Sequence, residues 1–309
     1  DQVIALKQQI ESEKLQQELS TKAKKLSPNK DKYIWIIYLW NNESSKIYVW
    51  LKQKYWEKIW IKWYVFGQYK KWDKLPENTK EDYDVQLYMK QEYDNIWKII
   101  DLIHYLNHDK DCVGIIVQLP LPEEFKKYKS QILSTISPNK DIDGMGGVLN
   151  GLSSIDLIDF VPATPKAVVK ILKEYDLYNI RWKIITVIWQ SNLVWKPLVL
   201  EFIKQWATVF STNSSTPVEK TKELCKMSDI IVSCTWVVHL VNDEFIRDDK
   251  SQILIDVWYG HKDWKPVWDI NFESVKDKVK YITPVPGGVW PLTVACLFEN
   301  IFDIQENLK

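Results

Sequence analysis

A tyrosine and a lysine one helical turn apart form the first pair in this chain whose spacing suggests chemistry. Tyr48 and Lys52 lie in the segment SKIYVWLK, residues 45–52, so a helix would place both on one face. An aromatic ring beside an amine suits a flat heterocyclic substrate and a proton transfer. A surface lysine stacked on a surface tyrosine would have the same spacing, so the pair alone leaves both interpretations open.

Two further segments place polar side chains next to turns. Gln118 follows the apolar run 113–117 and opens the segment QLPLP, and ligands of open α/β sheets bind at the carboxyl ends of strands. Its amide can both donate and accept hydrogen bonds. Asp141 and Asp143 lie in PNKDIDG, residues 138–144. Their carboxylates could accept hydrogen bonds from an amino-heterocycle, although Asp and Gly are equally typical of a solvated turn.

These three segments are followed, in order, by Thr164-Pro165, VIWQSNLVWKP (187–197) and TPVPGGVWPLTV (283–294). Together they resemble the methylenetetrahydrofolate dehydrogenase/methenyltetrahydrofolate cyclohydrolase family, from about residue 33 to about residue 300. The resemblance is specific because the motifs are spread over the chain and keep their order. It implies hydride transfer from 5,10-methylenetetrahydrofolate to NAD(P)+, followed by hydrolysis of the 5,10-methenyl cation to 10-formyltetrahydrofolate.

The resemblance also implies a role for each matching residue. Lys52 would be the base or water activator of the cyclohydrolase step, Tyr48 would pack on the folate, and Gln118 would hold Lys52. Asp143, with Asp141, would bind the pterin edge. The other substrate-binding residues would be Ser45, Pro286, Gly287 and Gly288, and the cofactor-binding residues Thr164, Trp189, Gln190, Ser191, Val194, Trp195, Lys196 and Pro197. No metal is expected, because the methenyl substrate is already an electrophilic cation.

The cofactor implied by the resemblance is NADP, with NAD as the alternative. In the family, basic residues commonly meet the 2′-phosphate of NADP through charge-assisted contacts. Here Gln190 and Ser215 occupy the two positions where such residues are usual, while Lys196 lies nearby. The usual anchors for NADP are therefore weak in this chain.

The composition contains 17 Trp and only 9 Gly, which is abnormal because turns with positive φ need glycine. Trp189 and Trp195 stand where the family's phosphate loop has glycine, so that the backbone can approach the pyrophosphate. Other tryptophans at family glycine positions are Trp40, Trp60, Trp206, Trp236, Trp258 and Trp290. We predict that many of the 17 are glycines in the natural protein, because some bacteria read the codon UGA as glycine. UGG codons at 189, 195 and 290 would instead indicate a Trp-rich, inactive paralogue.

The pattern of apolar runs predicts an α/β fold with two lobes and a cleft between them, because strands alternate with helices. We expect an N-terminal catalytic folate-binding domain at 1–150, completed by a C-terminal helix at 291–309, and a Rossmann-like NAD(P)-binding domain at 151–290. Expected strands are 33–39, 61–69, 113–117, 183–188, 207–211, 230–234 and 253–257. Expected helices are 2–26, 46–59, 80–107, 126–136, 164–175, 197–205 and 293–305, and expected loops are 137–151 and 283–291.

Composition argues against several other classes of protein. Lys and Arg number 41, as do Asp and Glu, so no basic excess indicates a nucleic-acid partner. The longest apolar run, 33–40, is too short to span a membrane. The polar first residues do not resemble a secretory signal, so we expect a cytoplasmic protein, and the resemblance implies a homodimer. A monofunctional enzyme or a non-catalytic folate- or dinucleotide-binding paralogue is the alternative; the presence of Lys52, Gln118 and Asp143 favours the bifunctional enzyme.

Overall fold

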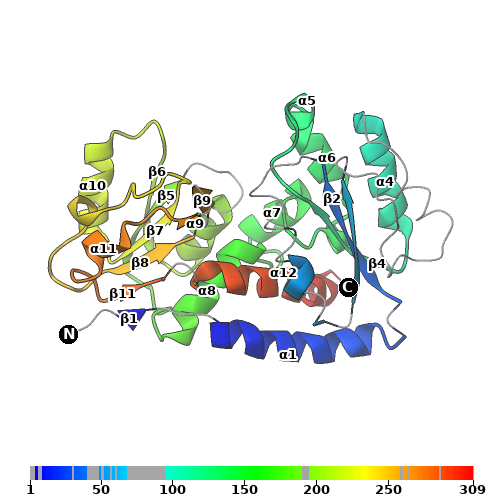
Figure 1. The fold of residues 1–309 in the computed structure, drawn as a ribbon, viewed down its shortest axis with the longest axis horizontal. Coiled ribbons are helices and arrows are strands. Elements are labelled where there is room, and N and C mark those ends of the chain that lie inside the picture. The colour runs from blue at the N-terminus through cyan, green and yellow to red at the C-terminus, as the bar shows by residue number, and fades with distance from the viewer. Residues whose placement is uncertain are drawn as a thin grey trace. The chain divides into compact units, whose positions relative to one another are not determined.

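The computed structural model describes residues 4–5, 9–29, 31–39, 49, 52–55, 58–59, 61–67, 95–189, 195–257, 260–262, 265–284 and 287–308. The chain forms two compact units (Figure 1). The three-stranded unit comprises Lys14–Phe160 and Leu297–Lys309, and the six-stranded unit comprises Asp1–Glu13 and Val161–Cys296. Each unit has its own sheet, so we describe each by itself.

The three-stranded unit is built on a parallel sheet in the order β3-β2-β4. Its strands are β2 (Tyr33–Tyr38), β3 (Lys62–Gly67) and β4 (Cys112–Val117). β2, with the sequence YIWIIY, is almost entirely buried, as expected for the central strand of a parallel sheet covered on both faces. The helical elements are α4 (Ile96–His108), α5 (Glu123–Lys126), α6 (Lys129–Thr135), the 3-10 turn η1 (Pro138–Lys140) and α7 (Gly147–Ser154).

Two helices contribute residues to both units, namely α1 (Gln9–Leu26) and α12 (Val289–Asn307). In the three-stranded unit, the best-defined helix boundary is the start of α4, where the Asn95 side chain accepts a hydrogen bond from the Lys98 N–H at 3.1 Å. This N-cap satisfies a backbone donor that the helix leaves unpaired. The apolar face of α4 then packs into the core with Tyr33, Trp35 and Tyr64.

The six-stranded unit has the strand order β1-β11-β8-β7-β5-β6, with every neighbouring pair parallel. The strands are β1 (Ile4–Ala5), β5 (Ile184–Trp189), β6 (Thr208–Thr212), β7 (Ile230–Cys234), β8 (Ile253–Asp256) and β11 (Tyr281–Ile282), and β9 (Gly260–Lys262) pairs antiparallel with β10 (Lys265–Val267). The helical elements are α8 (Ala163–Glu174), α9 (Trp195–Lys204), α10 (Val218–Met227), η2 (Asp243–Phe245) and α11 (Phe272–Val275). Because the chain moves to one side of β5 with β6 and to the other with β7, this is a doubly wound, Rossmann-like unit, which confirms the predicted fold class.

Several predicted elements were wrong in type. Residues 4–5 form a strand paired with β11 rather than the start of a helix, which begins at Gln9; a strand this short is set by a distant partner and leaves no local pattern. The predicted loop 137–151 contains η1 and most of α7. The predicted loop 283–291 includes the first turn of α12, where Pro291 is tolerated because no N–H is needed there.

Other differences concern missed helices. The predicted helix 126–136 corresponds to α6, whereas α5, which precedes it and shares only Lys126 with the predicted range, and α10 were not predicted. α10 buries only Thr221 and Cys225, so it has little of the apolar periodicity by which helices are recognised. The predicted helices 46–59 and 80–107 lie partly outside the described residues.

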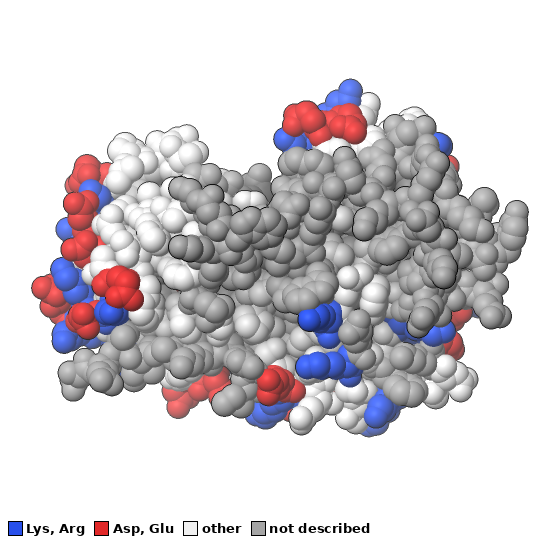
Figure 2. Space-filling model, viewed as in Figure 1, with Lys and Arg blue, Asp and Glu red and all other residues white. Residues whose placement is uncertain are grey.

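Charged side chains of both signs are mixed on the face shown in Figure 2. Around α10, Lys222 forms ion pairs with Glu219 at 2.8 Å and with Glu244 at 2.6 Å, and Lys220 pairs with Glu223 at 2.6 Å. Exposed pairs of this kind stabilise the fold by little. Among the helices that the structure describes, none is both long and apolar enough to cross a membrane.

Trp206 occupies a position that glycine usually fills. The end of α9 is closed by two hydrogen bonds, from the Ala207 N–H to the Phe202 carbonyl at 3.1 Å and from the Trp206 N–H to the Ile203 carbonyl at 2.9 Å. This is the Schellman arrangement, whose penultimate residue is left-handed and most often glycine. Trp206 has φ 62° and is 68% exposed. The left-handed region disfavours a side chain with a Cβ.

Trp182 shows the same conflict in a tight turn. The Lys183 N–H donates to the Ile180 carbonyl at 2.9 Å, and Trp182, the third residue of that turn, has φ 68°. A positive φ at this position is typical of glycine. The Arg181 guanidinium lies 5.1 Å from the Trp182 ring and 5.6 Å from the Trp206 ring, a contact that offsets part of the backbone strain.

We predict that Trp206→Gly stabilises the protein. Relief of the left-handed strain, less the contact with Arg181, should raise the free energy of unfolding by about 0.5–1 kcal/mol. Trp97→Gly is the matched control, because Trp97 is equally exposed, at 65%, but helical; it should lower the same quantity by up to about 1 kcal/mol. Urea titration of both variants measures the difference, and equal destabilisation by the two would contradict the prediction.

Candidate functional site

The site in the three-stranded unit centres on a buried amine. Lys52 lies in the helical residues 52–55 and is only 8% exposed. Its Nζ donates a hydrogen bond to Gln118 Oε1 at 3.0 Å, and Gln118 Nε2 donates to the Leu119 carbonyl at 2.9 Å. The second bond orients the amide so that its oxygen faces the amine. The strand end at Gln118 therefore fixes the position of Lys52.

Burial sets the electrostatics of this amine. Desolvation lowers the pKa of Lys52, and the nearby charge of Asp143 opposes this shift. Desolvation also raises the pKa of Asp143, and the charge of Lys52 opposes that shift in turn. Burial disfavours the charged form of both groups. A lysine whose pKa is lowered is closer to its neutral form, which can accept a proton at a physiological pH.

Asp141 has a different role from Asp143. Its carboxylate is buried and accepts hydrogen bonds from the backbone N–H groups of Gly144 at 3.1 Å, Met145 at 3.2 Å and Gly146 at 2.6 Å. Burial raises the pKa of Asp141 to about 6, against the lowering effect of these three amides. This position gives no support to direct contact between Asp141 and the pterin; the carboxylate instead holds the loop 141–146 that carries Asp143.

The same loop is held from two helices and one strand. Asn150 Nδ2, on α7, donates to the carbonyls of Gly144 at 2.6 Å and Gly146 at 3.0 Å. Asn300 Nδ2, on α12, donates to the Ile142 carbonyl at 2.9 Å. On the strand side, a Cβ added at Gly114 of β4 would meet Ile142 Cδ1 at 2.7 Å. Asn150 and Asn300 were not predicted from the sequence, and the apolar residues on either side of the Glu299-Asn300 pair, at 297–298 and 301–302, are the signal that could have found Asn300.

The remaining predicted site residues fall into two groups. Ser45, Tyr48, Pro286, Gln190, Ser191, Val194 and the side chain of Trp195 lie outside the described residues. The others lie in the six-stranded unit: Thr164 in the first turn of α8, Trp189 at the end of β5, Lys196 and Pro197 in α9, and Gly287 and Gly288 just before α12. Thus Lys52, Gln118 and Asp143 are the predicted residues that the structure brings together in one place.

Gly287 and Gly288 each need to be glycine for a separate reason. Gly287 has φ 108°, a backbone conformation that side chains with a Cβ rarely adopt. A Cβ added at Gly288 would meet the Pro284 carbonyl oxygen at 2.7 Å. The turn before α12 therefore depends on both residues.

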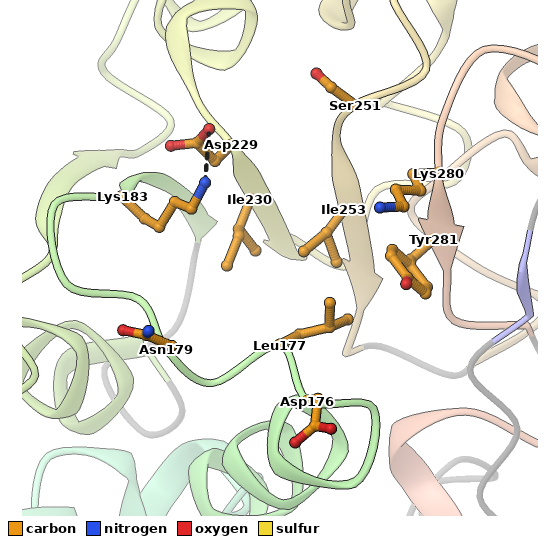
Figure 3. A pocket seen from close by; sticks show the side chains of 10 residues that line it. All are labelled: Asp176, Leu177, Asn179, Lys183, Asp229, Ile230, Ser251, Ile253, Lys280 and Tyr281. Atoms are coloured by element: carbon orange, nitrogen blue, oxygen red, sulfur yellow. Dashed lines mark ion pairs between the residues drawn. The ribbon is translucent and has the colours of Figure 1, made fainter.

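The six-stranded unit has a candidate ligand edge at the carboxyl ends of β5 and β7. These two strands are adjacent, with Trp189 opposite Cys234, and the strand order reverses there, which is where doubly wound sheets bind ligands. A pocket of about 200 Å³ lies at the opposite, amino ends of the strands (Figure 3). Lys183 and Asp229, an ion pair at 3.6 Å, line it, so this pocket is separate from the carboxyl edge.

The two units together define the class of the protein as a dinucleotide-dependent enzyme with a second site for proton transfer. One has the sheet of a dinucleotide-binding domain, and the other holds a buried lysine suited to proton transfer. Among the described residues, no group of three His, Cys, Asp or Glu side chains could hold a metal ion.

Comparison with known proteins specifies the family. Residues 5–143 match the model of the tetrahydrofolate dehydrogenase/cyclohydrolase catalytic domain, and residues 162–309 match that of its NAD(P)-binding domain. The chain is 35% identical over 266 residues to the bifunctional protein FolD of Lactobacillus acidophilus, covering 86% of this chain and 84% of that protein. The chain belongs to the tetrahydrofolate dehydrogenase/cyclohydrolase family.

Solved structures agree with this assignment. The bifunctional FolD dehydrogenase/cyclohydrolase of Campylobacter jejuni superposes with a TM-score of 0.82 at 30% identity, covering 98% of this chain and 99% of that one. The Trypanosoma brucei enzyme, solved with NADP and an inhibitor, has a TM-score of 0.82 at 26% identity, covering 99% and 98%. The predicted activity is confirmed: this is a bifunctional 5,10-methylenetetrahydrofolate dehydrogenase and 5,10-methenyltetrahydrofolate cyclohydrolase that uses NAD(P).

The glycines of the 141–146 loop provide a matched test of its geometry. A Cβ added at Gly146 would meet Asp141 Oδ2 at 2.8 Å, whereas one added at Gly147 meets nothing within 4 Å. We predict that Gly146→Ala lowers the free energy of unfolding by about 1–3 kcal/mol and reduces cyclohydrolase turnover. Gly147→Ala should leave both unchanged or raise the stability. Denaturant titration and methenyltetrahydrofolate hydrolysis check this, and equal behaviour of the two variants would contradict it.

Proposed function

We propose that Lys52 is the base of the cyclohydrolase step. Water adds to the electrophilic methenyl carbon of the bound cation, and the neutral amine of Lys52 takes the proton that the water loses. The hydroxyl group of this adduct then loses its proton and becomes the formyl carbonyl as the carbon–N5 bond breaks, and N5 takes up a proton, which gives 10-formyltetrahydrofolate. The burial of this amine and its oriented hydrogen bond to Gln118 are the observations that support this role.

Asp143 has the complementary role in this proposal. Its carboxylate binds the amino edge of the pterin. Its negative charge raises the pKa of Lys52, whereas the positive charge of the bound substrate lowers it. The bound cation lowers the pKa of Lys52 further, since like charges disfavour the ionised form. Tyr48 packs on the folate ring, and Ser45 and Pro286 complete the substrate site with Gly287 and Gly288.

We further propose that the nicotinamide cofactor is NADP. Support comes from the family and from the NADP bound to the Trypanosoma brucei relative. The dinucleotide lies at the carboxyl edge of the six-stranded sheet, against Thr164, residues 189–191 and 194–197, with its phosphates at the start of α9. Lys196, which is exposed at that helix start, is the basic residue that meets the 2′-phosphate in this proposal. NAD remains the alternative.

The tryptophans at family glycine positions are glycines in the natural protein, on this proposal. Trp206 and Trp236 were predicted as such from the sequence, and both have positive φ, 62° and 65°; Trp182, with φ 68°, adds a third case. Trp35 differs, because it is fully buried and its ring packs against Tyr33 and Tyr64. The backbone therefore supports glycine at particular positions rather than at all 17.

We also propose where the protein acts, how it assembles and how its domains are divided. The protein acts as a cytoplasmic homodimer on tetrahydrofolate derivatives, with no nucleic-acid or membrane partner. Its folate-binding domain, predicted at 1–150 with the helix 291–309, corresponds to the three-stranded unit, and its NAD(P)-binding domain, predicted at 151–290, corresponds to the six-stranded unit, which also contains residues 1–13. Family membership supports the assembly and the substrates, and the balanced charge supports the absence of a nucleic-acid partner.

Replacing Lys52 by methionine tests the proposed base. Lys52→Met should lower cyclohydrolase turnover by at least about 100-fold, the usual contribution of a positioned general base, while part of the hydride transfer survives. Lys54→Met, at an exposed position of the same helical segment, is the control and should leave both activities unchanged. The absorbance of the methenyl compound follows both steps. Undiminished hydrolysis by Lys52→Met would refute the role.

The pH profile tests the protonation state. The neutral amine is the active form and its pKa is lowered from 10.5, so cyclohydrolase kcat/KM should rise with pH through a pKa below that of a free lysine. Gln118→Glu adds a negative charge next to Nζ and should move this rise to higher pH. Stopped-flow hydrolysis across the pH range measures both profiles. An identical rise in Gln118→Glu would count against Lys52 as the titrating group.

A further inference from the structure

A buried carboxylate holds the loop that follows β7. Asp269 Oδ2 accepts hydrogen bonds from the Thr235 N–H at 2.6 Å and from Ser233 Oγ at 2.9 Å, and Asp269 Oδ1 accepts from the Val237 N–H at 3.1 Å. Trp236, between the two amides, has φ 65°. Successive N–H groups around a left-handed residue form a concave nest for an anion. Here the anion is a side chain of the protein itself.

Backbone bonds tie the same loop, residues 235–241, to the segment around Asp269. The His239 N–H donates to the Trp268 carbonyl at 3.0 Å and the Val241 N–H donates to the Asp269 carbonyl at 3.1 Å. A second buried carboxylate, that of Asp256 at the end of β8, accepts from the Ile270 N–H at 2.8 Å. Residues 268–270, which are themselves held by hydrogen bonds, therefore fix the position of the loop.

The fold places this loop at the dinucleotide edge of the sheet. β7 lies next to β5, and Cys234, the last residue of β7, pairs with Trp189, the last residue of β5. The loop 235–241 therefore begins beside the carboxyl end of β5. The strand order reverses between these two strands, and ligands of doubly wound sheets bind outside the carboxyl ends at such a switch point.

We propose that Asp269 is a positioning residue for the dinucleotide, acting through the loop 235–241. Asp269 is fully buried, so it does not touch the cofactor. Instead, Asp269 sets which backbone groups of the loop face the cofactor. This inference rests on the proposed dinucleotide site. It assigns to Asp269 an effect on hydride transfer alone, because Lys52, Gln118 and Asp143 lie in the other unit.

Asparagine at position 269 disrupts this arrangement without changing the size of the side chain. One carboxylate oxygen becomes an NH₂ group, which faces an N–H or O–H donor instead of accepting from it. Hydrogen bonds to a charged acceptor are the stronger ones, and burial, which raises the pKa of Asp269, is opposed by the amide of Thr235. The loop should therefore loosen in Asp269→Asn.

The test compares Asp269→Asn with its parent, the full chain carrying glycine at residues 189, 195 and 236. The KM for NADP should rise by about tenfold or more, the loss expected for one or two charge-assisted hydrogen bonds. Methenyltetrahydrofolate hydrolysis should change by less than about twofold, since the two sites are independent. Amide hydrogen exchange should accelerate in 235–241 and not in β5.

Asp229→Asn is the matched control, because the Asp229 carboxylate also accepts a hydrogen bond from a backbone N–H, that of Ile184 at 2.9 Å, but at the amino end of β7. This variant should change neither the KM for NADP nor the hydrogen exchange of the loop.

Three results would overturn the inference. An unchanged KM for NADP with unchanged loop exchange would show that Asp269 does not position the loop. Equal loss of both activities in Asp269→Asn would show a general structural role. A parent that reduces neither NADP nor NAD would refute the proposed dinucleotide site, and this inference with it, whereas the first two results leave that site intact.

Discussion

The hydrogen bond between Lys52 and Gln118 is the interaction on which the proposed cyclohydrolase site depends. An ammonium group removed from water is costly unless it is well paired, and this amine has one amide oxygen at 3.0 Å and a carboxylate acting at longer range. The balance favours the neutral amine more than water does. The rest of the three-stranded unit serves to place one strand end and one loop around that amine.

In each unit, a buried carboxylate holds a loop through hydrogen bonds from the backbone of that loop. Asp141 in one unit and Asp269 in the other are buried carboxylates whose oxygens accept hydrogen bonds from backbone N–H groups of a loop. Unlike a hydrophobic contact, such an anchor is directional, because each amide must point at the anion. It also explains why the neighbouring residues have special backbone conformations, with φ 69° at Gly144 and φ 65° at Trp236.

Left-handed tryptophans mark positions where the backbone favours glycine. A left-handed glycine costs no steric strain, whereas a Cβ does, so Trp206 and Trp236 are costly wherever the fold needs that turn. Trp35 has no such backbone conflict, because its strand is extended and its ring packs in the core against Tyr33 and Tyr64, but its buried Nε1–H has no hydrogen-bond partner among the described residues. The backbone thus separates tryptophans whose φ conflicts with a side chain from one whose extended strand accepts it.

The amino-acid sequence by itself determined the fold class and the family, because buried strands and ordered motifs are local patterns, and it singled out Lys52, Gln118 and Asp143, which the structure brings together. It misjudged the strand at 4–5 and missed α10, since the first depends on pairing with β11 and the second has almost no apolar face. Only the tertiary structure showed that Asp141, unlike Asp143, is used to hold its own loop, and that Asn300 and Asp269 also hold loops through hydrogen bonds. Their roles rest on contacts with residues far apart in the chain, such as Asn300 with Ile142, and on burial that no local spacing encodes.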